Sequence, residues 1–359
     1  MYPAEQQSKQ TAFRRAEKIY KARNRQPDMS QVVDVSKPHL HPDIVSPVRL
    51  TRSLKEPPGT PFKVFSEQRP PAYALRGHPG LLVIPNPLTD EAQRWLARKC
   101  LCDCAKPPNH TNLDPFFDLP PKSLFALSSN PCSTNIANKD AEGGVTKPKD
   151  KFYTQPQPAA MVLERLRWCT LGQQYNWTTK KYDSGHSTFD SEIDGLMKAV
   201  AVAATSPEMG ERPAGSKGGD EVAVNDYEGA NFASQAGIVN YYGERDFMSG
   251  HVDKTEENMD APLISLSCGL SCVYLIGGAT RDVEPTAIYL RSGDVLAMCG
   301  ESRLAFHGVP LIIPDSSPAY LCDSEAGTHD AVANVYPEWQ HFAQYLSHHR
   351  INCNARKCT

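Results

Sequence analysis

Short segments rich in β-prone residues fill the carboxyl-terminal part of the chain. Ile264-Ser-Leu266-Ser-Cys268 alternates between apolar and polar residues, which is the pattern of a strand with one buried face. Turn residues such as Gly269 and Gly293 separate the segments. We expect strands over residues 236–242, 263–268, 271–276, 286–291 and 294–298. Short strands at such intervals predict a sandwich or jelly roll.

Helical patterns are concentrated before these strands. Phe13, Ala16 and Tyr20 lie at i, i+3 and i+7, which predicts a short amphipathic helix with a basic polar face. Thr89 and Asp90 can cap a helix over residues 91–104. Further predictions are a buried strand over 80–86, a helix over 161–167, and an extended segment over 168–171. Loops are expected over 26–72, 128–151 and 206–220, the last as an insertion.

The order of these elements predicts an α+β fold with a β core. We divide the chain into a basic helix with a proline-rich extension (1–75), a helical and substrate-recognition part with loops (76–235), and a catalytic core of strands (236–359).

Composition limits the classes of protein to consider. The net charge is −3, so a nucleic-acid surface must be a local patch rather than a property of the whole molecule. No apolar run is long enough for a spanning helix, and the polar amino terminus is unlike a secretory signal. The cysteines, including Cys100-x-Cys102-x-Cys104, lack disulfide-framework or zinc spacing. We therefore expect free thiols and an intracellular address.

The chemistry is concentrated in His251-x-Asp253 and His307. Two histidines and one carboxylate form the facial ligand set of non-haem Fe(II) oxygenases, which leaves coordination positions open for co-substrate and oxygen. Residues two apart on a strand point to the same face, and His307 lies beyond the strand array, in an apolar setting that disfavours an unpaired imidazole.

Other readings of these histidines stay open. His39-x-His41 and His348-His349 are competing pairs, and we interpret both as surface residues. Two histidines and a carboxylate also hold catalytic zinc, so a zinc hydrolase is possible on the residues alone. Zinc hydrolysis does not explain Arg350 and Arg356, which an extended strand would place on one face with Asn352 between them. Such a pair could bind a dicarboxylate, or could simply belong to a basic tail.

The chain resembles the AlkB family of nucleic-acid dioxygenases, and in its amino-terminal half the AlkB homologue 1 subfamily. The motifs that carry this resemblance occur in the family's order: Asn240-x-Tyr242, His251-x-Asp253, Cys299-Gly-Glu-Ser-Arg303-Leu-x-x-His307-Gly308, and Arg350-x-Asn352-x-x-x-Arg356. The similarity extends from about Phe13, excluding the 206–220 insertion, with poor agreement over 128–151.

The resemblance implies a double-stranded β-helix with the metal between its sheets. It implies His251, Asp253 and His307 as Fe(II) ligands, and it places 2-oxoglutarate among the following residues: Asn240, Tyr242, Arg350, Asn352 and Arg356. Substrate contacts implied in the same way are Trp168, Tyr175 and Arg281. Two positions depart from the family pattern. Gln173 replaces an expected aromatic residue, and Thr255 replaces an acid, so base discrimination does not carry over.

The implied reaction uses Fe(II), 2-oxoglutarate and O2 to demethylate a base, releasing formaldehyde, succinate and CO2. The subfamily points to demethylation of N1-methyladenine in tRNA and of N6-methyladenine in DNA, and to oxidation of 5-methylcytosine in tRNA. The target base must be flipped or single-stranded to reach such a site. The alternatives are a histone or other protein demethylase with the same iron site, and a silent nucleic-acid-binding module. The basic amino-terminal helix suits either a nuclear or a mitochondrial address.

Overall fold

The computed structural model describes residues 10–21, 27–129, 134–139, 151–176, 181–186, 188–205, 207–209 and 227–359, without the side chains of 175–176, 181–186 and 207–209. Its α-helices are α1 (Ala12–Tyr20), α2 (Asp90–Arg98), α3 (Leu124–Ser128), α4 (Ala159–Leu163), α5 (Ser191–Ala204), α6 (Ala319–Cys322) and α7 (Trp339–Leu346). The α2 helix continues as a π-helix over Lys99–Cys104, and short 3-10 turns occupy Pro38–Leu40, Lys151–Thr154, Gly229–Asn231, Gly300–Leu304 and Ala333–Val335. Among these described residues, no helix is long and apolar enough to cross a membrane.

Two antiparallel sheets face each other. The larger has ten strands in the order β7-β6-β9-β16-β11-β14-β3-β2-β1-β8, and the smaller has four in the order β10-β15-β12-β13. The strands of the larger sheet are β1 (Val45–Leu50), β2 (Ala72–Leu75), β3 (Leu81–Ile84), β6 (Trp168–Asn176), β7 (Lys181–His186), β8 (Pro207–Met209), β9 (Ala236–Gly243), β11 (Leu263–Gly269), β14 (Val295–Met298) and β16 (His349–Arg356). Those of the smaller sheet are β10 (Met248–His251), β12 (Cys272–Ile276), β13 (Thr286–Leu290) and β15 (His307–Ile312), and β4 (Asn135–Ile136) pairs separately with β5 (Gln157–Pro158).

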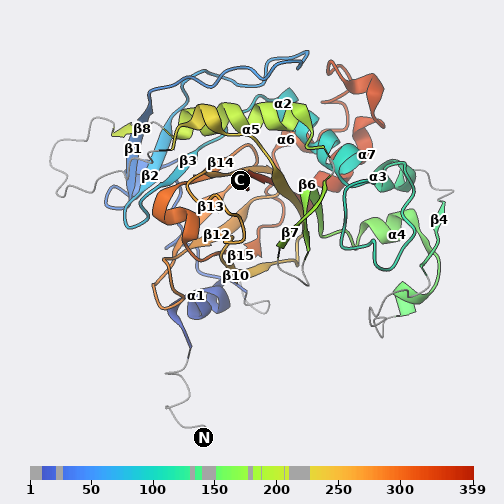
Figure 1. Cartoon of the computed structure of the whole chain (residues 1–359), viewed down its shortest axis with the longest axis horizontal. Helices are drawn as coiled ribbons and strands as arrows, with labels where there is room; N and C mark the ends of the chain where they lie inside the picture. Colours follow the sequence, from blue (N-terminus) through green and yellow to red (C-terminus); the bar gives the residue numbers. More distant parts are fainter. Residues whose placement is uncertain are drawn as a thin grey trace, which may run out of the picture.

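Alternation along the strands assigns each residue to a layer. On β16, Ile351, Cys353 and Ala355 are fully buried in the core beneath α2 and α5. Those two helices cover the outer face of the larger sheet (Figure 1). The intervening residues of β16 face the smaller sheet, because successive side chains of a strand point to opposite faces. The space between the two sheets is therefore lined by every second residue of each strand.

Helix α1 covers the opposite side of the molecule. Phe13, Ala16 and Tyr20 are buried against Val273 and Leu275 of β12, on the outer face of the smaller sheet. Figure 1 shows α1 beside β10 and β15, far along the sequence from both. The predicted amphipathic helix is thus confirmed, and its apolar face is occupied.

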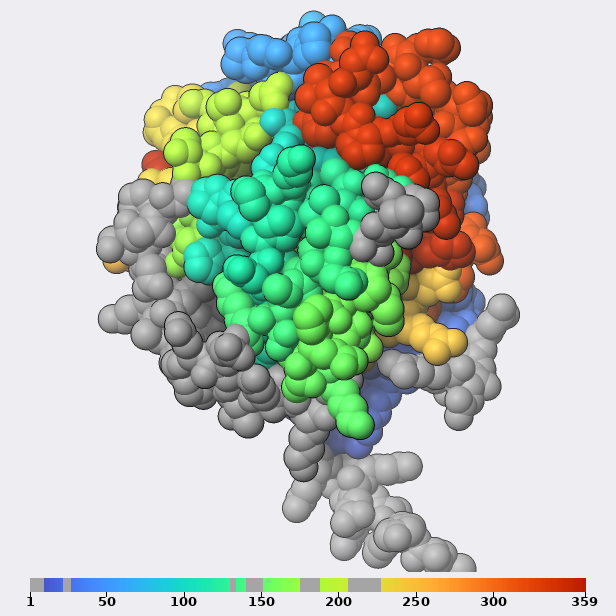
Figure 2. Space-filling view, turned by 90° about the vertical axis from the view of Figure 1, so that its right-hand side faces the viewer, coloured from blue at the N-terminus to red at the C-terminus, as the bar shows by residue number. Residues whose placement is uncertain are grey.

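The side of the molecule formed by α3 and α4 joins the amino-terminal half to the carboxyl-terminal segment. The ring of Phe125 on α3 lies 4.4 Å from that of Phe342 on α7 and edge-on to Tyr345. Figure 2 shows this side, with the green segment directly against the red one. Aromatic contacts of this geometry add to the free energy gained by burial.

The β core follows the sequence prediction closely. The five expected strands match β9, β11, β12, β13 and β14 to within one or two residues at most ends, and the α+β double-stranded β-helix is confirmed. Three local predictions need correction. The proline-rich segment 26–72 contains β1, a strand of the larger sheet; the helix expected at 161–167 is α4 and ends at Leu163; and the extended segment 168–171 is the start of the longer β6. Much of 128–151 and 206–220 lies outside the described residues.

Strands from all three stretches of the proposed division meet in the larger sheet. The division stays a prediction about which part does what. It does not describe separate sheets.

We expect Gly269→Ala to destabilise the fold strongly. Gly269 has φ +83°, and a methyl group there would overlap the carbonyl oxygen of His349 on the neighbouring strand. Left-handed strain alone costs about 1–2 kcal/mol, and the overlap with backbone adds to it. Urea unfolding measures the loss of unfolding free energy. Gly59→Ala is the matched control, since φ there is +89° but the space is open. An equal cost in both variants would contradict the packing argument.

Candidate metal centre and the adjoining pocket

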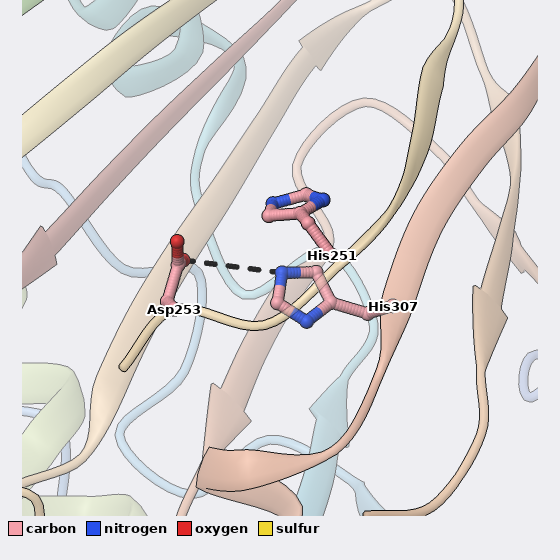
Figure 3. Close-up of side chains that lie close together, drawn as sticks. All are labelled: His251, Asp253 and His307. Atoms are coloured by element: carbon pink, nitrogen blue, oxygen red, sulfur yellow. Dashed lines mark ion pairs between the residues drawn. The ribbon is translucent and has the colours of Figure 1, made fainter. Parts of the chain in front are cut away.

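His251, Asp253 and His307 converge between the sheets. Their candidate ligand atoms all lie within 4.8 Å of one another. His251 ends β10 and pairs in register with His307, the first residue of β15. Figure 3 shows both rings and the Asp253 carboxylate pointing toward one another, with Oδ2 of Asp253 3.9 Å from Nε2 of His307. Asp253 lies beyond the end of β10, so it does not share a strand face with His251 as the sequence predicted. The pairing of β10 with β15 brings the two histidines together, and the coil after β10 brings Asp253 to them.

Hydrogen bonds fix which nitrogen of each histidine is free for a metal. Nδ1 of His251 lies 3.0 Å from the carbonyl oxygen of Ser249, and Nδ1 of His307 lies 3.1 Å from that of Ala305. A carbonyl can only accept, so each Nδ1 carries the proton and each Nε2 keeps a lone pair. Burial, followed by the nearby His251, lowers the pKa of His307 to about 4. A neutral imidazole is the form that binds metals.

Buried arginines hold the Asp253 carboxylate in its charged form. Burial by itself would raise the pKa of Asp253, but the charges of Arg356, the two histidines and Arg303 outweigh it and lower this pKa well below the usual range. Nη1 of Arg356 lies 3.4 Å from Oδ1 of Asp253, and Nη1 of Arg303 donates to the Asp253 carbonyl at 2.6 Å.

Glu256 completes this network and was missed by the sequence reasoning. Its side chain is fully buried and pairs with Arg303 at 2.9 Å and with Arg356 at 3.0 Å. Both arginines then touch Asp253. The sequence does show an acidic residue three positions after Asp253. Only the fold shows that this residue, Glu256, pairs with two arginines.

A cavity of about 540 Å³, including its open mouth, adjoins the three converging side chains. Asn240 and Asn352, which pair in register on neighbouring strands of the larger sheet, both line it. Tyr242 and Arg350 form the next pair on the same face. The predicted positions Asn240, Tyr242, Arg350 and Asn352 all line the cavity, together with Ser265 and Asn354, which the sequence reasoning did not single out. Arg356 instead contacts Asp253 and Glu256 beside it.

Arg350 is a cation buried in the wall of this cavity. Its side chain donates to the Leu270 carbonyl at 3.1 Å and to Oγ of Ser267 at 2.7 Å, and the residue is 1% exposed. Among the described residues no carboxylate forms an ion pair with Arg350, and its Nε has no hydrogen-bond partner. A buried guanidinium without a counter-ion is costly, and a bound carboxylate would offset that cost.

The remaining cavity residues are polar groups in fixed positions. Nδ2 of Asn352 donates to Oγ of Ser265 at 2.7 Å and to the Leu266 carbonyl at 3.2 Å. Burial raises the pKa of Tyr242, so its hydroxyl stays protonated and can donate to an anion. The chemistry of the wall therefore suits an acidic molecule that reaches from Arg350 toward the three metal-binding candidates.

The predicted substrate residues lie in different settings. Trp168 pairs in register with Asn240, so its side chain shares the cavity face of the larger sheet. The side chain of Tyr175 is outside the described residues. Arg281 donates to the Gly250 carbonyl at 2.8 Å and stacks over Phe306. Gln173 lies in β6 and Thr255 is exposed.

In the described part of the chain, the competing histidine pairs do not form a metal site. The prediction that both residues of His348-His349 are on the surface is wrong for His349, which is buried against the ring of Tyr345. Within the described ranges, His251, Asp253 and His307 are the one group of three or more histidines, cysteines or acids placed to hold an ion. Cys100, Cys102 and Cys104 are free, buried thiols, as predicted. The Asp253 carboxylate and the Nε2 atoms of the two histidines can bind one face of a metal ion, and the cavity leaves the other face open. Such a site on a double-stranded β-helix is typical of Fe(II) oxygenases.

Comparisons with known proteins agree with this class. The model of the 2OG-Fe(II) oxygenase superfamily matches residues 125–356. The chain is 33% identical to the tRNA demethylase abh1 of Schizosaccharomyces pombe, over 96% of this chain and 95% of that protein. It is 31% identical to the nucleic acid dioxygenase ALKBH1 of Mus musculus (97% and 84% covered), and 29% identical to the DNA N(6)-methyladenine demethylase ALKBH1A of Arabidopsis thaliana (97% and 96%). The chain belongs to the 2OG-Fe(II) oxygenase superfamily and, within it, to the AlkB homologue 1 subfamily.

Membership of this superfamily excludes two of the alternatives that the residues alone left open. The protein is a dioxygenase that uses Fe(II) and 2-oxoglutarate, so the zinc hydrolase and the silent binding module are set aside.

Proposed function

We propose that this protein is a nucleic acid demethylase in which His251, Asp253 and His307 hold Fe(II). The observation that carries the proposal is that these three side chains open into the same cavity whose wall contains the buried Arg350, which forms no ion pair with a carboxylate among the described residues. An oxygenase of this class needs a metal with free positions and a binding site for 2-oxoglutarate beside it. The proposed assignment of these residues would meet both requirements within one cavity.

The proposed co-substrate site is made by the larger sheet. Arg350 receives the distal carboxylate of 2-oxoglutarate, while Asn240, Tyr242 and Asn352 line its path toward the metal. Arg356 keeps Asp253 anionic and faces the metal end. When bound, iron and 2-oxoglutarate supply an oxidant able to break a methyl C–H bond. The part of the protein is to orient both.

The proposed demethylation substrates are N1-methyladenine in tRNA, chiefly, and N6-methyladenine in DNA, and the same site would oxidise the methyl group of 5-methylcytosine in tRNA. The support comes from relatives whose names describe a tRNA demethylase and a DNA N(6)-methyladenine demethylase. The metal candidates line a cavity between the two sheets. A flipped or single-stranded base is therefore required. Trp168, on the cavity face, and Tyr175 and Arg281 are the proposed substrate contacts.

A substrate panel tests the proposal. We expect the purified full chain, supplied with Fe(II), 2-oxoglutarate and O2, to convert N1-methyladenine in tRNA, with one succinate formed for each methyl group lost. Mass spectrometry of digested nucleosides and of succinate measures both. Unmethylated tRNA of the same sequence is the control for uncoupled turnover. Coupled methyl loss from histone peptides, with none from tRNA or DNA, would overturn the nucleic-acid assignment in favour of a protein demethylase.

A further inference from the structure

The two histidines of the candidate metal site are each preceded by a residue that contacts α1. Gly250 comes directly before His251, and Phe306 directly before His307. Helix α1 packs on β10, β12 and β15, which carry or support these residues (Figure 1). Since β10 and β15 are neighbours at the edge of the smaller sheet, their outer faces depend on α1 for cover.

Glu17 is a buried carboxylate that the proposed reaction does not use. It is 3% exposed, and its Oε1 accepts the backbone N–H of Gly250 at 2.6 Å. Its Oε2 accepts from Arg14 at 2.8 Å. Burial tends to raise the pKa of Glu17, but the bonds from Arg14 and Gly250 more than compensate and lower it, so the acceptor is an anion. A short hydrogen bond to an anion is among the stronger ones in proteins.

The ring of Phe13 packs directly against Gly250. The ring is 1% exposed, and a methyl group added to Gly250 would overlap it. The ring also lies against Gly277 and 6.3 Å, centroid to centroid, from that of Phe306. One aromatic side chain of α1 thus contacts the residues that lead into both histidines.

Arg281 closes the arrangement from the other side. Its guanidinium donates to the Gly250 carbonyl at 2.8 Å, and its own carbonyl accepts the N–H of Phe13 at 2.9 Å. Gly250 therefore has its N–H held by Glu17 and its carbonyl held by Arg281. The backbone that aims His251 is fixed at both polar groups.

We propose that Glu17 is a positioning residue of the metal site: through its bond to Gly250 it sets the backbone from which His251 reaches the metal. Phe13 and Arg281 complete this clamp. The inference rests on the proposed assignment of His251 and His307 as metal ligands. It gives α1 a role in metal affinity that is separate from any contact with substrate.

Anaerobic titration of the full chain with Co(II), followed by visible absorption in the presence of 2-oxoglutarate, tests the clamp. We expect Glu17→Ala to weaken Co(II) binding about tenfold, the lower end of what outer residues of metal sites contribute. At saturating metal, the KM for 2-oxoglutarate should be unchanged, because Arg350 is untouched. Glu17→Gln should bind Co(II) nearly as well as the parent, since its amide oxygen can still accept from Gly250.

Three further variants separate the explanations. Glu284→Gln removes the other ion pair of α1, with Arg15 at the surface, and should leave Co(II) affinity unchanged. If Glu17→Ala unfolds, Glu17→Asp replaces it, because it keeps the charge beside Arg14 but is one methylene too short for Gly250. Parent-like Co(II) affinity in folded Glu17→Ala or Glu17→Asp would overturn the clamp. His251→Ala is the reference: if it too bound Co(II) normally, the metal assignment itself would fail.

Discussion

Replacing Arg350 by alanine should raise the KM for 2-oxoglutarate by about 100-fold or more, while iron binding persists. The guanidinium is buried in the cavity wall, holds Ser267 and Leu270, and has an Nε without a partner among the described residues. Truncating one member of a buried charge pair costs about 2–5 kcal/mol, or roughly 30-fold to several thousand-fold, and the expected rise in KM lies within that range. Succinate formation at varied 2-oxoglutarate concentration measures KM and kcat separately.

Two control variants show whether the rise in KM depends on the paired N–H donors of the Arg350 guanidinium. Arg350→Lys keeps the charge but not the paired geometry, so its KM should lie between those of the parent and of Arg350→Ala. Arg291→Ala removes a guanidinium that pairs with Asp34 at 2.8 Å and does not line the cavity. Its stability should fall with KM unchanged. A normal KM in Arg350→Ala would place the co-substrate elsewhere.

Replacing Asp253 by alanine should abolish turnover, by at least about 1,000-fold, through loss of iron. In the proposed site Asp253 supplies the anionic ligand, and its removal also takes away the carboxylate that lies 3.4 Å from Nη1 of Arg356. Breaking a buried charge pair costs about 3–5 kcal/mol, and a loss of about 1,000-fold lies within that range. Metal analysis after anaerobic loading and desalting measures iron per chain, and succinate formation measures activity.

The double variant His39→Ala/His41→Ala is the matched control, since the sequence offers this pair as a competing ligand set. His39 is exposed and His41 is half-buried, and neither belongs to the assembled group. Iron content and turnover should equal those of the parent. Iron retained in Asp253→Ala but lost in the double variant would reverse the assignment.

Local patterns sufficed for much of the core. Alternation in residues 263–268 predicted β11, and the i, i+3, i+7 spacing of Phe13, Ala16 and Tyr20 predicted α1, because both patterns record which face of one element is buried. The spacing of Arg350, Asn352 and Arg356 correctly placed all three on one face of β16. Cys100 to Cys104 were correctly read as free thiols.

Predictions failed where neighbours distant in sequence decide the outcome. β1 lies within a proline-rich stretch with weak alternation, and it is a strand because β2 and β8 offer it partners. The helix at 159–163 ends earlier than its sequence pattern suggested. Short segments have little intrinsic preference, so tertiary contacts select their structure.

The sequence by itself predicted the class of this protein. Local period predicted the β core and the shared face of Arg350 and Arg356, because it records which side chains of a strand point the same way. Residue type alone left a zinc hydrolase open, and the order of motifs shared with the AlkB family favoured the iron oxygenase. Only the tertiary structure decided which charges meet. It put Glu256 between Arg303 and Arg356, and Glu17 against Gly250. Each of these pairings joins elements far apart along the chain, and no local period records them.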